Sequence, residues 1–123
     1  LNNAIAAHHM GSMSFFFEGA AAARAYGIEA GRYWSLLQRT LPGLEAGLSG
    51  LADKIVRRDY ASDDADTAGA SVGQICGSMF DAFETFQALG LKPVMTQAVM
   101  TCAKRGADLG HADKDFSYLT ECF

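Results

Sequence analysis

The chain has 123 residues, of which 50% are hydrophobic, and this is enough for one domain with an apolar core but too short for two. The formal net charge is −4, and Lys and Arg never form a run longer than a pair, which argues against a nucleic-acid surface or a patch for anionic membranes. No segment of about 18 uncharged apolar residues is present that could span a bilayer. We therefore expect one domain that binds neither nucleic acid nor membrane.

The cysteines and the first residues bear on the compartment. Three cysteines without a C-x-x-C pair suggest neither a disulfide framework nor a zinc site. The start Leu1-Asn2-Asn3 lacks the basic flank and apolar stretch of a secretory signal. A reducing cytoplasm fits this pattern best.

Alanine is abundant while valine and isoleucine are few, which favours helix over sheet along the whole chain. A first, long helix is predicted from Asn2 to Tyr26, with Gly27 able to take the left-handed conformation that ends a helix. A short second helix is predicted over Glu29–Arg39. The predicted fold class is all-α, a long helix followed by a bundle of about five helices.

The third helix is predicted to have Pro42 in its first turn. Its apolar residues recur at spacings of three and four, which predicts one buried stripe of Leu41, Leu44, Leu48, Leu51 and Ile55. An acidic turn over Asp59–Asp66 follows, where Asp63 or Asp64 is expected to cap the fourth helix. That helix carries apolar residues at helical spacing and is closed by Gly90: Ala68, Val72, Ile75, Met79, Phe83 and Phe86.

Two further helices complete the chain. Pro93 is expected to open a fifth helix that continues through Leu109 and is ended by Gly110. A last short helix, capped by Asp113 or Asp115, holds the apolar residues Phe116, Leu119 and Phe123.

The first helix is unusual because Phe15, Phe16 and Phe17 point in directions about 100° apart and cannot all face one core. It is either the central helix of a monomer or a helix wrapped by a second subunit. Because a domain this small rarely encloses so long a helix, we favour the dimer.

Gly69-Ala70-Ser71-Val72-Gly73 matches G-x-S-x-G, the nucleophile elbow of serine hydrolases, but that motif requires a preceding strand and none is predicted. The glycines of Gly69-x-x-x-Gly73-x-x-x-Gly77 could form a groove of small residues, either for tight helix packing or as a wall beside a flat ligand. Adjacent His8 and His9 cannot both bind one metal ion, so no metal site is predicted. His111 is expected to bond a carbonyl of the last helical turn.

The C-terminal half carries a specific set of motifs. These are Asp59-Tyr60, the acidic start Asp63-Asp64, Ala88-Leu89-Gly90-Leu91 before a Pro-initiated helix, and Gly110-His111-Ala112-Asp113-Lys114-Asp115-Phe116. Together they resemble the C-terminal domain of imine reductases and reductive aminases, within the 6-phosphogluconate and beta-hydroxyacid dehydrogenase superfamily. The resemblance covers essentially the whole chain, 1–123, as a single helical domain, and identifies 1–26 as the long interdomain helix. It also favours a native origin for His8-His9-Met10-Gly11-Ser12, which otherwise looks like the remnant of an expression tag.

The resemblance implies a second half of the enzyme that is absent from this chain. In the family, an N-terminal Rossmann domain binds NADP, the helical domain forms an intertwined homodimer, and the active site lies between the Rossmann domain of one subunit and the helical domain of the other. The implied reaction is hydride transfer from the cofactor to a C=N or C=O carbon of a small-molecule substrate. The alternative is a stand-alone helical dimerisation module without catalysis.

Carried over residue by residue, the resemblance puts Asn2 where the family has a catalytic Asp or Lys, and Met10 where a Tyr often lines the imine pocket. Asn cannot donate a proton as an acid does, although it can hydrogen-bond a substrate nitrogen or oxygen; it could equally cap the helix. Thr40, Thr67 and Ala70 fall near positions that line the substrate pocket. No cofactor-binding residue is assigned.

Overall fold

The computed structural model describes residues 1–62 and 69–123, and this part of the chain is all-α, as predicted. The elements in chain order are α1 (Asn2–Ala25), α2 (Ala30–Gln38), α3 (Leu41–Arg57), α4 (Val72–Ala88), α5 (Val94–Gly106), a π-helical turn η1 (Ala107–His111) and a 3₁₀ helix η2 (Phe116–Cys122). The bounds of α1 and α2 agree with the predicted helices to within one residue. Pro42 lies in the first turn of α3, as predicted.

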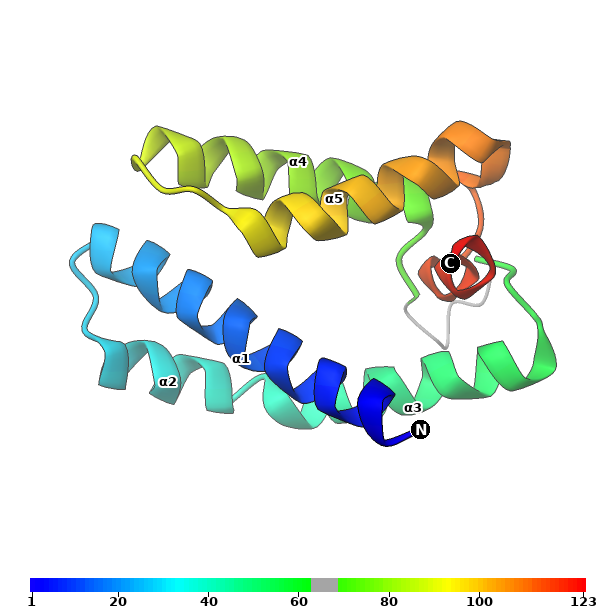
Figure 1. Ribbon diagram of the computed structural model, residues 1–123, viewed down its shortest axis with the longest axis horizontal. Coiled ribbons are helices and arrows are strands. Elements are labelled where there is room, and N and C mark those ends of the chain that lie inside the picture. Colours follow the sequence, from blue (N-terminus) through cyan, green and yellow to red (C-terminus); the bar gives the residue numbers. More distant parts are fainter. Residues whose placement is uncertain (63–68) are drawn as a thin grey trace.

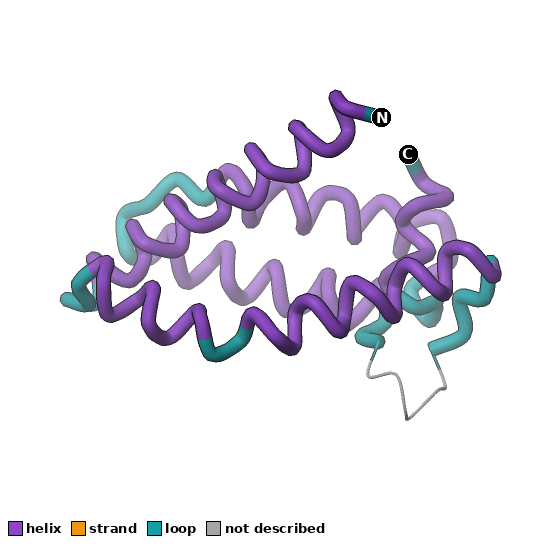
Figure 2. The backbone as a smooth tube through the Cα atoms, turned by 90° about the horizontal axis from the view of Figure 1, so that it is seen from below, coloured by secondary structure: helices purple, strands orange, loops and turns teal. Residues whose placement is uncertain are grey.

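The helices form two hairpins joined by α3. Figure 1 shows α4 and α5 side by side along one edge of the molecule and α1 beside α2 along the other. In the view from below, α2 runs into α3 with only a short break, and α1 extends away from its neighbours toward the N-terminus (Figure 2). The C-terminal η2 packs against both α5 and the end of α3.

Both hairpin turns depend on a glycine in the left-handed conformation. Gly27 has φ 74° and follows α1, and Gly90 has φ 77° and follows α4. After each glycine the next amide donates back into the helix, Ile28 N to Ala23 O at 2.9 Å and Leu91 N to Phe86 O at 3.0 Å. These bonds satisfy carbonyls that the helix end leaves free. Both predicted helix ends are thus confirmed.

The best-buried core lies where α4, α5 and η2 meet. Val72 and Ala103 are fully buried, and Leu119 and Cys122 nearly so. A Cβ atom at Gly106 would lie 2.7 Å from Leu119 Cδ2 and 3.1 Å from Val72 Cγ1, so only a glycine lets η2 approach α5 this closely. Cys76 and Cys102 pack against this core, and all three thiols are free, as expected for reduced core cysteines.

The apolar stripe predicted to be buried on α3 is open to solvent in the single chain. Leu44 is 56% exposed and Leu48 45%, while Leu41 and Ile55 are also exposed and Leu51 is half-buried. The prediction of burial is therefore wrong for one chain, because α5 packs against α1 and η2, and α4 against α5 and η2, which leaves this face of α3 uncovered. The periodicity shows an apolar face, but it cannot show what covers that face.

The start of α4 also differs from the expectation. The helix begins at Val72, and its cap is Ser71, whose hydroxyl accepts from Gln74 N at 3.1 Å while Gln74 Oε1 accepts from Ser71 N at 2.8 Å. This reciprocal capping box explains why the helix begins here. The predicted caps Asp63 and Asp64, and Ala68, lie outside the described residues.

The C-terminal end follows the prediction in outline. The regular α-helical turns of α5 end at Gly106, η1 continues to His111, and Gly110 has φ 88°, so the predicted glycine stop is confirmed. The predicted cap Asp115 is confirmed, because its side chain accepts from Ser117 N. The prediction for His111 is wrong: its ring packs on Tyr118 with the centroids 4.4 Å apart, because η2 brings the tyrosine against it.

The long helix α1 is covered only at its C-terminal end. Ala22 and Ala23 are buried, whereas residues 1–10 are all exposed. Phe16 packs between Tyr33 and Trp34 of α2, but Phe15 is 40% and Phe17 64% exposed. The single chain thus leaves Phe17 mostly and Phe15 partly exposed, as their divergent directions suggested.

Candidate functional site

The segment that connects α3 to α4 crosses the segment before η2. Ser71 and Asp115 form an isolated antiparallel bridge, in which Phe116 N donates to Ala70 O at 3.0 Å and Val72 N donates to Lys114 O at 2.8 Å. On the other side of Asp115, its own amide donates to Tyr60 O at 2.9 Å. These bonds fix Asp115 between two parts of the chain and beside the last turns of α3.

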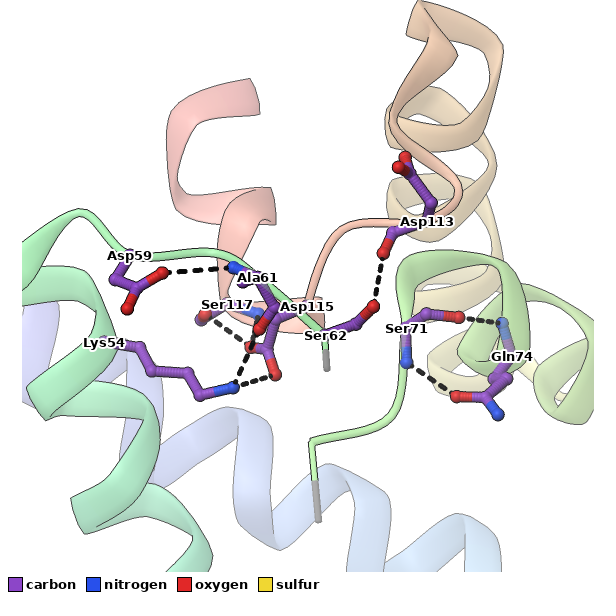
Figure 3. Close-up of polar contacts among 9 residues, drawn as sticks. All are labelled: Lys54, Asp59, Ala61, Ser62, Ser71, Gln74, Asp113, Asp115 and Ser117. Atoms are coloured by element: carbon purple, nitrogen blue, oxygen red, sulfur yellow. Dashed lines mark hydrogen bonds and ion pairs between the residues drawn. The ribbon is translucent and has the colours of Figure 1, made fainter. Parts of the chain in front are cut away.

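Asp115 forms a buried ion pair with Lys54 of α3 (Figure 3). Lys54 Nζ lies 2.7 Å from Asp115 Oδ2 and also donates to Ala61 O at 3.3 Å. The other carboxylate oxygen, Oδ1, accepts from Ser117 N at 2.9 Å and from the Ser117 hydroxyl at 2.5 Å. The side chain of Asp115 is fully buried and that of Lys54 is 8% exposed, so both charges depend on these partners.

The pair determines the charge state of the aspartate. Burial by itself raises the pKa of Asp115, but the hydrogen bonds from Lys54 and Ser117 and the lysine charge outweigh it, so the pKa lies below its ordinary value. Asp115 is therefore ionised at neutral pH, and the pair as a whole is neutral.

Gly69, in the segment that connects α3 to α4, packs directly against the ion pair. A Cβ atom at Gly69 would collide with Asp115 Oδ2 and lie 3.1 Å from Lys54 Nζ. The predicted groove of Gly69, Gly73 and Gly77 is therefore only partly right. Gly69 precedes α4 rather than lying on it, and a Cβ atom at Gly77 would meet nothing within 4 Å. Gly73 does allow close packing, because a Cβ atom there would lie 3.0 Å from Ala112 O. The three do not form one groove.

A cavity of about 380 Å³ lies beside the ion pair. Its wall on α3 is made of small and apolar residues, and Gly69, Ala70 and the ion pair form the opposite side; the complete lining is Ala46, Gly47, Gly50, Leu51, Lys54, Gly69, Ala70, Ile75, Asp115 and Phe116. Since Lys54 and Asp115 neutralise each other, the cavity suits an uncharged, mainly apolar group.

The structure brings few of the predicted site residues together. Ala70 lines the cavity, whereas Asn2 and Met10 lie on the exposed N-terminal part of α1. Asn2 is the first residue of that helix, and no side chain caps its N-terminus. Thr40 precedes α3 and donates its hydroxyl to Leu37 O at 2.7 Å, outside the cavity lining. Thr67 lies outside the described residues.

Sequence reasoning missed the ion pair itself. The sequence indicates Asp115 as a helix cap and as part of the C-terminal motif, but it does not single out Lys54, because the two residues are 61 positions apart in the chain. One signal was available: Lys54 follows Leu51 by three positions and therefore lies along the apolar stripe of α3. A lysine at such a position indicates a buried partner.

A second, larger hollow of about 680 Å³ lies between α1, α2, α3 and the α4–α5 hairpin. It is mainly aromatic and aliphatic, and we call it the apolar groove; its lining is Ser12, Met13, Phe15, Phe16, Glu18, Gly19, Tyr33, Trp34, Leu37, Leu41, Leu44, Met79, Ala82, Phe86 and Thr96. The groove includes Leu41 and Leu44 of the exposed stripe. Nothing within the described chain covers it.

The described residues contain neither a cluster of metal ligands nor a membrane-spanning helix. No three His, Cys, Asp or Glu side chains among them lie close enough together to hold a metal ion. None of the helices that the structure describes is long and apolar enough to cross a bilayer.

One family model and several solved structures are similar to this chain. The model of the NADPH-dependent reductive aminase-like C-terminal domain matches residues 7–123. An imine reductase from Pseudomonas sp. is similar in structure, with a TM-score of 0.87 and 21% identity over 96% of this chain and 39% of that chain. A comparison with curated protein sequences gives no match.

Two further solved structures show the same likeness. A reductive aminase from Aspergillus terreus, in complex with NADPH4, cyclohexanone and allyl amine, has a TM-score of 0.87 and 19% identity over 98% of this chain and 41% of that chain. An imine reductase from Myxococcus stipitatus in complex with NADP+ has a TM-score of 0.89 and 16% identity over 98% of this chain and 43% of that chain. The chain thus spans about two fifths of the length of each of these three structures.

Proposed function

The chain belongs to the family of NADPH-dependent reductive aminase-like C-terminal domains, and we propose that it is the dimerisation and substrate-pocket domain of an NADPH-dependent oxidoreductase. In the proposed reaction, hydride passes from NADPH to the carbon of a C=N or C=O group, and the nitrogen or oxygen takes up a proton. The observation that carries the proposal is the family match over residues 7–123 together with a cavity that Ala70 lines.

The cofactor is expected to be bound chiefly outside this chain. Dinucleotide phosphates are held by a glycine-rich turn between a strand and a helix, and the sequence contains no G-x-G-x-x-G while the described residues form no such turn. The residues present therefore do not fit NADPH by themselves. We assign its binding to an N-terminal Rossmann domain, and the chain alone is expected not to bind it.

The cavity beside the ion pair is the proposed contribution of this chain to the substrate pocket. Its glycine and alanine wall on α3 leaves room for an apolar substituent, and its neutral ion pair attracts neither a free cation nor a free anion. An uncharged aliphatic or alicyclic part of an imine or ketone fits such walls. Thr40 and Thr67 remain proposed substrate-pocket residues of the complete enzyme.

The apolar groove and the exposed stripe of α3 support an intertwined homodimer. Apolar surfaces that large, together with the exposed Phe15 and Phe17 of α1, mark an interaction site. A second copy would cover them and would bring the pocket of one chain to the N-terminal part of α1 from the other. The proposed compartment of the complete enzyme is the cytoplasm.

Asn2 and Met10 are the proposed substrate contacts on α1. If Asn2 orients the substrate by one hydrogen bond, Asn2→Ala in the complete enzyme should lower kcat/KM about tenfold, the equivalent of about 1.4 kcal/mol. Asn2→Asp should restore or improve imine reduction, because a nearby carboxylate favours the protonated iminium. Unchanged kcat/KM in both variants would end the catalytic role of this position.

The activity itself is tested on the protein encoded by the complete reading frame. NADPH oxidation is measured with a cyclic imine and with cyclohexanone plus allyl amine, and cyclohexanone alone serves as the control. Imine-dependent turnover supports the proposal. A complete reading frame without a dinucleotide-binding βαβ segment, or a folded dimer without turnover, would favour the non-catalytic dimerisation module instead.

A further inference from the structure

The N-terminus of α5 is capped by a side chain from another helix. Its own cap residue is Pro93, which has no side-chain hydrogen bond to offer. Glu18 of α1 takes this role: Oε2 accepts from Met95 N at 2.8 Å, and Oε1 accepts from Thr96 N at 2.9 Å and from the Thr96 hydroxyl at 2.5 Å. The carboxylate thereby meets two amide groups that the helix cannot satisfy internally.

The surroundings of these three hydrogen bonds strengthen them. Thr96 is 5% exposed and Glu18 is half-buried, so the three bonds are largely shielded from water. A carboxylate at a helix N-terminus also interacts favourably with the helix dipole, and bonds from amides to an ionised acceptor are stronger than bonds between neutral groups. Removal of the carboxylate would leave shielded amides of α5 without an acceptor.

In the C-terminal half of α1, where Glu18 lies, the helix contacts both α2 and α5. The next residue, Gly19, packs against Tyr33 of α2 so closely that a Cβ atom there would collide with the tyrosine hydroxyl. One turn further on, Ala22 and Ala23 are buried. These small residues allow the helices to approach closely but carry no polar side-chain group that could bind α5. Among the side chains described for α1, Glu18 is the one with polar bonds to α5.

A small change in the direction of α1 at Glu18 becomes a larger displacement toward the N-terminus of the helix. At a rise of 1.5 Å per residue, Met10 lies about 12 Å and Asn2 about 24 Å from Glu18 along the helix axis. A rotation of about 5° at Glu18 would therefore displace Asn2 by about 2 Å. Displacements of about 1 Å at reacting groups can lower rates as much as a hundredfold.

We propose that Glu18 is a positioning residue: its carboxylate, bound to the first turn of α5, sets the direction of α1 and so the place of Asn2 and Met10. The kinetic part of this inference rests on the proposed function, whereas the structural part does not. Glu18 touches no reacting atom and acts only through the helix that carries it.

The test is Glu18→Gln in the complete enzyme, with Glu84→Gln on the exposed face of α4 as the matched control. A glutamine keeps the length but loses the charge and places an amide donor where only acceptors fit. We expect crystal structures superposed on α4 and α5 to show α1 rotated by several degrees in Glu18→Gln and unchanged in the control. At a temperature below every melting point, kcat should fall about tenfold or more while KM for NADPH stays constant.

Thr96→Val supplies a milder variant in case Glu18→Gln does not fold, because it removes the hydroxyl and keeps both amide bonds. It should give a smaller rotation and a smaller loss of kcat. An α1 direction unchanged in the variants overturns the proposal whatever the rates are. If α1 is rotated but kcat is unchanged in an active enzyme, Glu18 does not position catalytic groups. If the wild-type enzyme is inactive, the proposed function is refuted. The direction of α1 in the variants still shows whether Glu18 sets it.

Discussion

At the scale of single residues, a few charged side chains bind partners that are distant in the sequence. Lys54 and Asp115 neutralise each other in the interior, and Glu18 caps a helix other than its own. Each replaces water around a charge by protein donors or acceptors, which is the condition for burying charge at all. Their effects on stability can therefore be separated from those of surface charges.

Lys54→Met should destabilise the fold by about 3–5 kcal/mol, because the carboxylate of Asp115 would be left buried without its cation. The double variant Lys54→Met with Asp115→Leu should recover only part of the loss, since it removes the unpaired buried charge but also takes the acceptor from the Ser117 amide and hydroxyl. Urea unfolding followed by circular dichroism gives these free energies.

The matched control for Lys54 is Lys104→Met. Lys104 also forms an ion pair, with Asp108 at 2.6 Å, but both side chains are about two thirds exposed. This variant should show no measurable change. Equal effects of the two lysine variants would contradict the argument from burial.

The lowered pKa of Asp115 makes stability depend on pH in the acid range. A carboxyl group with a pKa lower in the folded than in the unfolded state contributes stability above its unfolded value, about 3.9, and this is lost as the pH falls through its folded value. Wild-type stability should therefore fall below about pH 4. Asp115→Asn should be less stable at neutral pH and show a smaller fall, as measured by urea midpoints from pH 2 to 6; parallel curves would rule out this group as the cause.

At the scale of elements, helix ends are decided by particular residues. Left-handed Gly27 and Gly90 end α1 and α4, and each is the residue that the sequence indicated. The helix N-termini follow no single rule: α4 is capped locally by Ser71 and Gln74, whereas α5 is capped by Glu18 of α1. Local signals therefore predict an end well, but a cap from another helix becomes visible only when the helices are placed.

Ser71→Ala should destabilise the protein by about 1 kcal/mol, because the hydroxyl that accepts from Gln74 N is lost at the start of α4. Ser78→Ala, on the exposed face of the same helix, should change the free energy of unfolding by less than about 0.5 kcal/mol. Chemical denaturation of both variants is the measurement. A neutral Ser71→Ala would show that the capping box does not stabilise this helix.

At the scale of the whole molecule, one chain leaves much of its apolar surface uncovered. The buried core lies between α4, α5 and η2, while the apolar groove and the stripe along α3 lie open to solvent. A small domain can keep such faces if a second copy covers them. The proposed homodimer follows from this distribution.

Leu44→Asp tests the homodimer. Because Leu44 is 56% exposed in the single chain and lines the apolar groove, a charge there should cost the monomer little but oppose association, where it would be desolvated. Light scattering at micromolar concentration should give a dimer for the wild type and a monomer for the variant. The control is Val56→Asp, also on α3 but 84% exposed and outside the groove lining, which should remain dimeric. A wild-type chain that is a stable monomer with native helicity would contradict the dimer.

The sequence by itself determined the all-α class and the ends of the first two helices, since alanine content, helical periodicity and glycine stops are local properties. It also carried the motifs, such as Gly110-His111 before Asp113, that resemble the family which the comparisons then showed. Only the tertiary structure decided which faces are covered and which charges meet. The stripe on α3 remained exposed, and Lys54 found Asp115 across 61 positions, because burial and pairing depend on how helices pack and periodicity describes each helix alone.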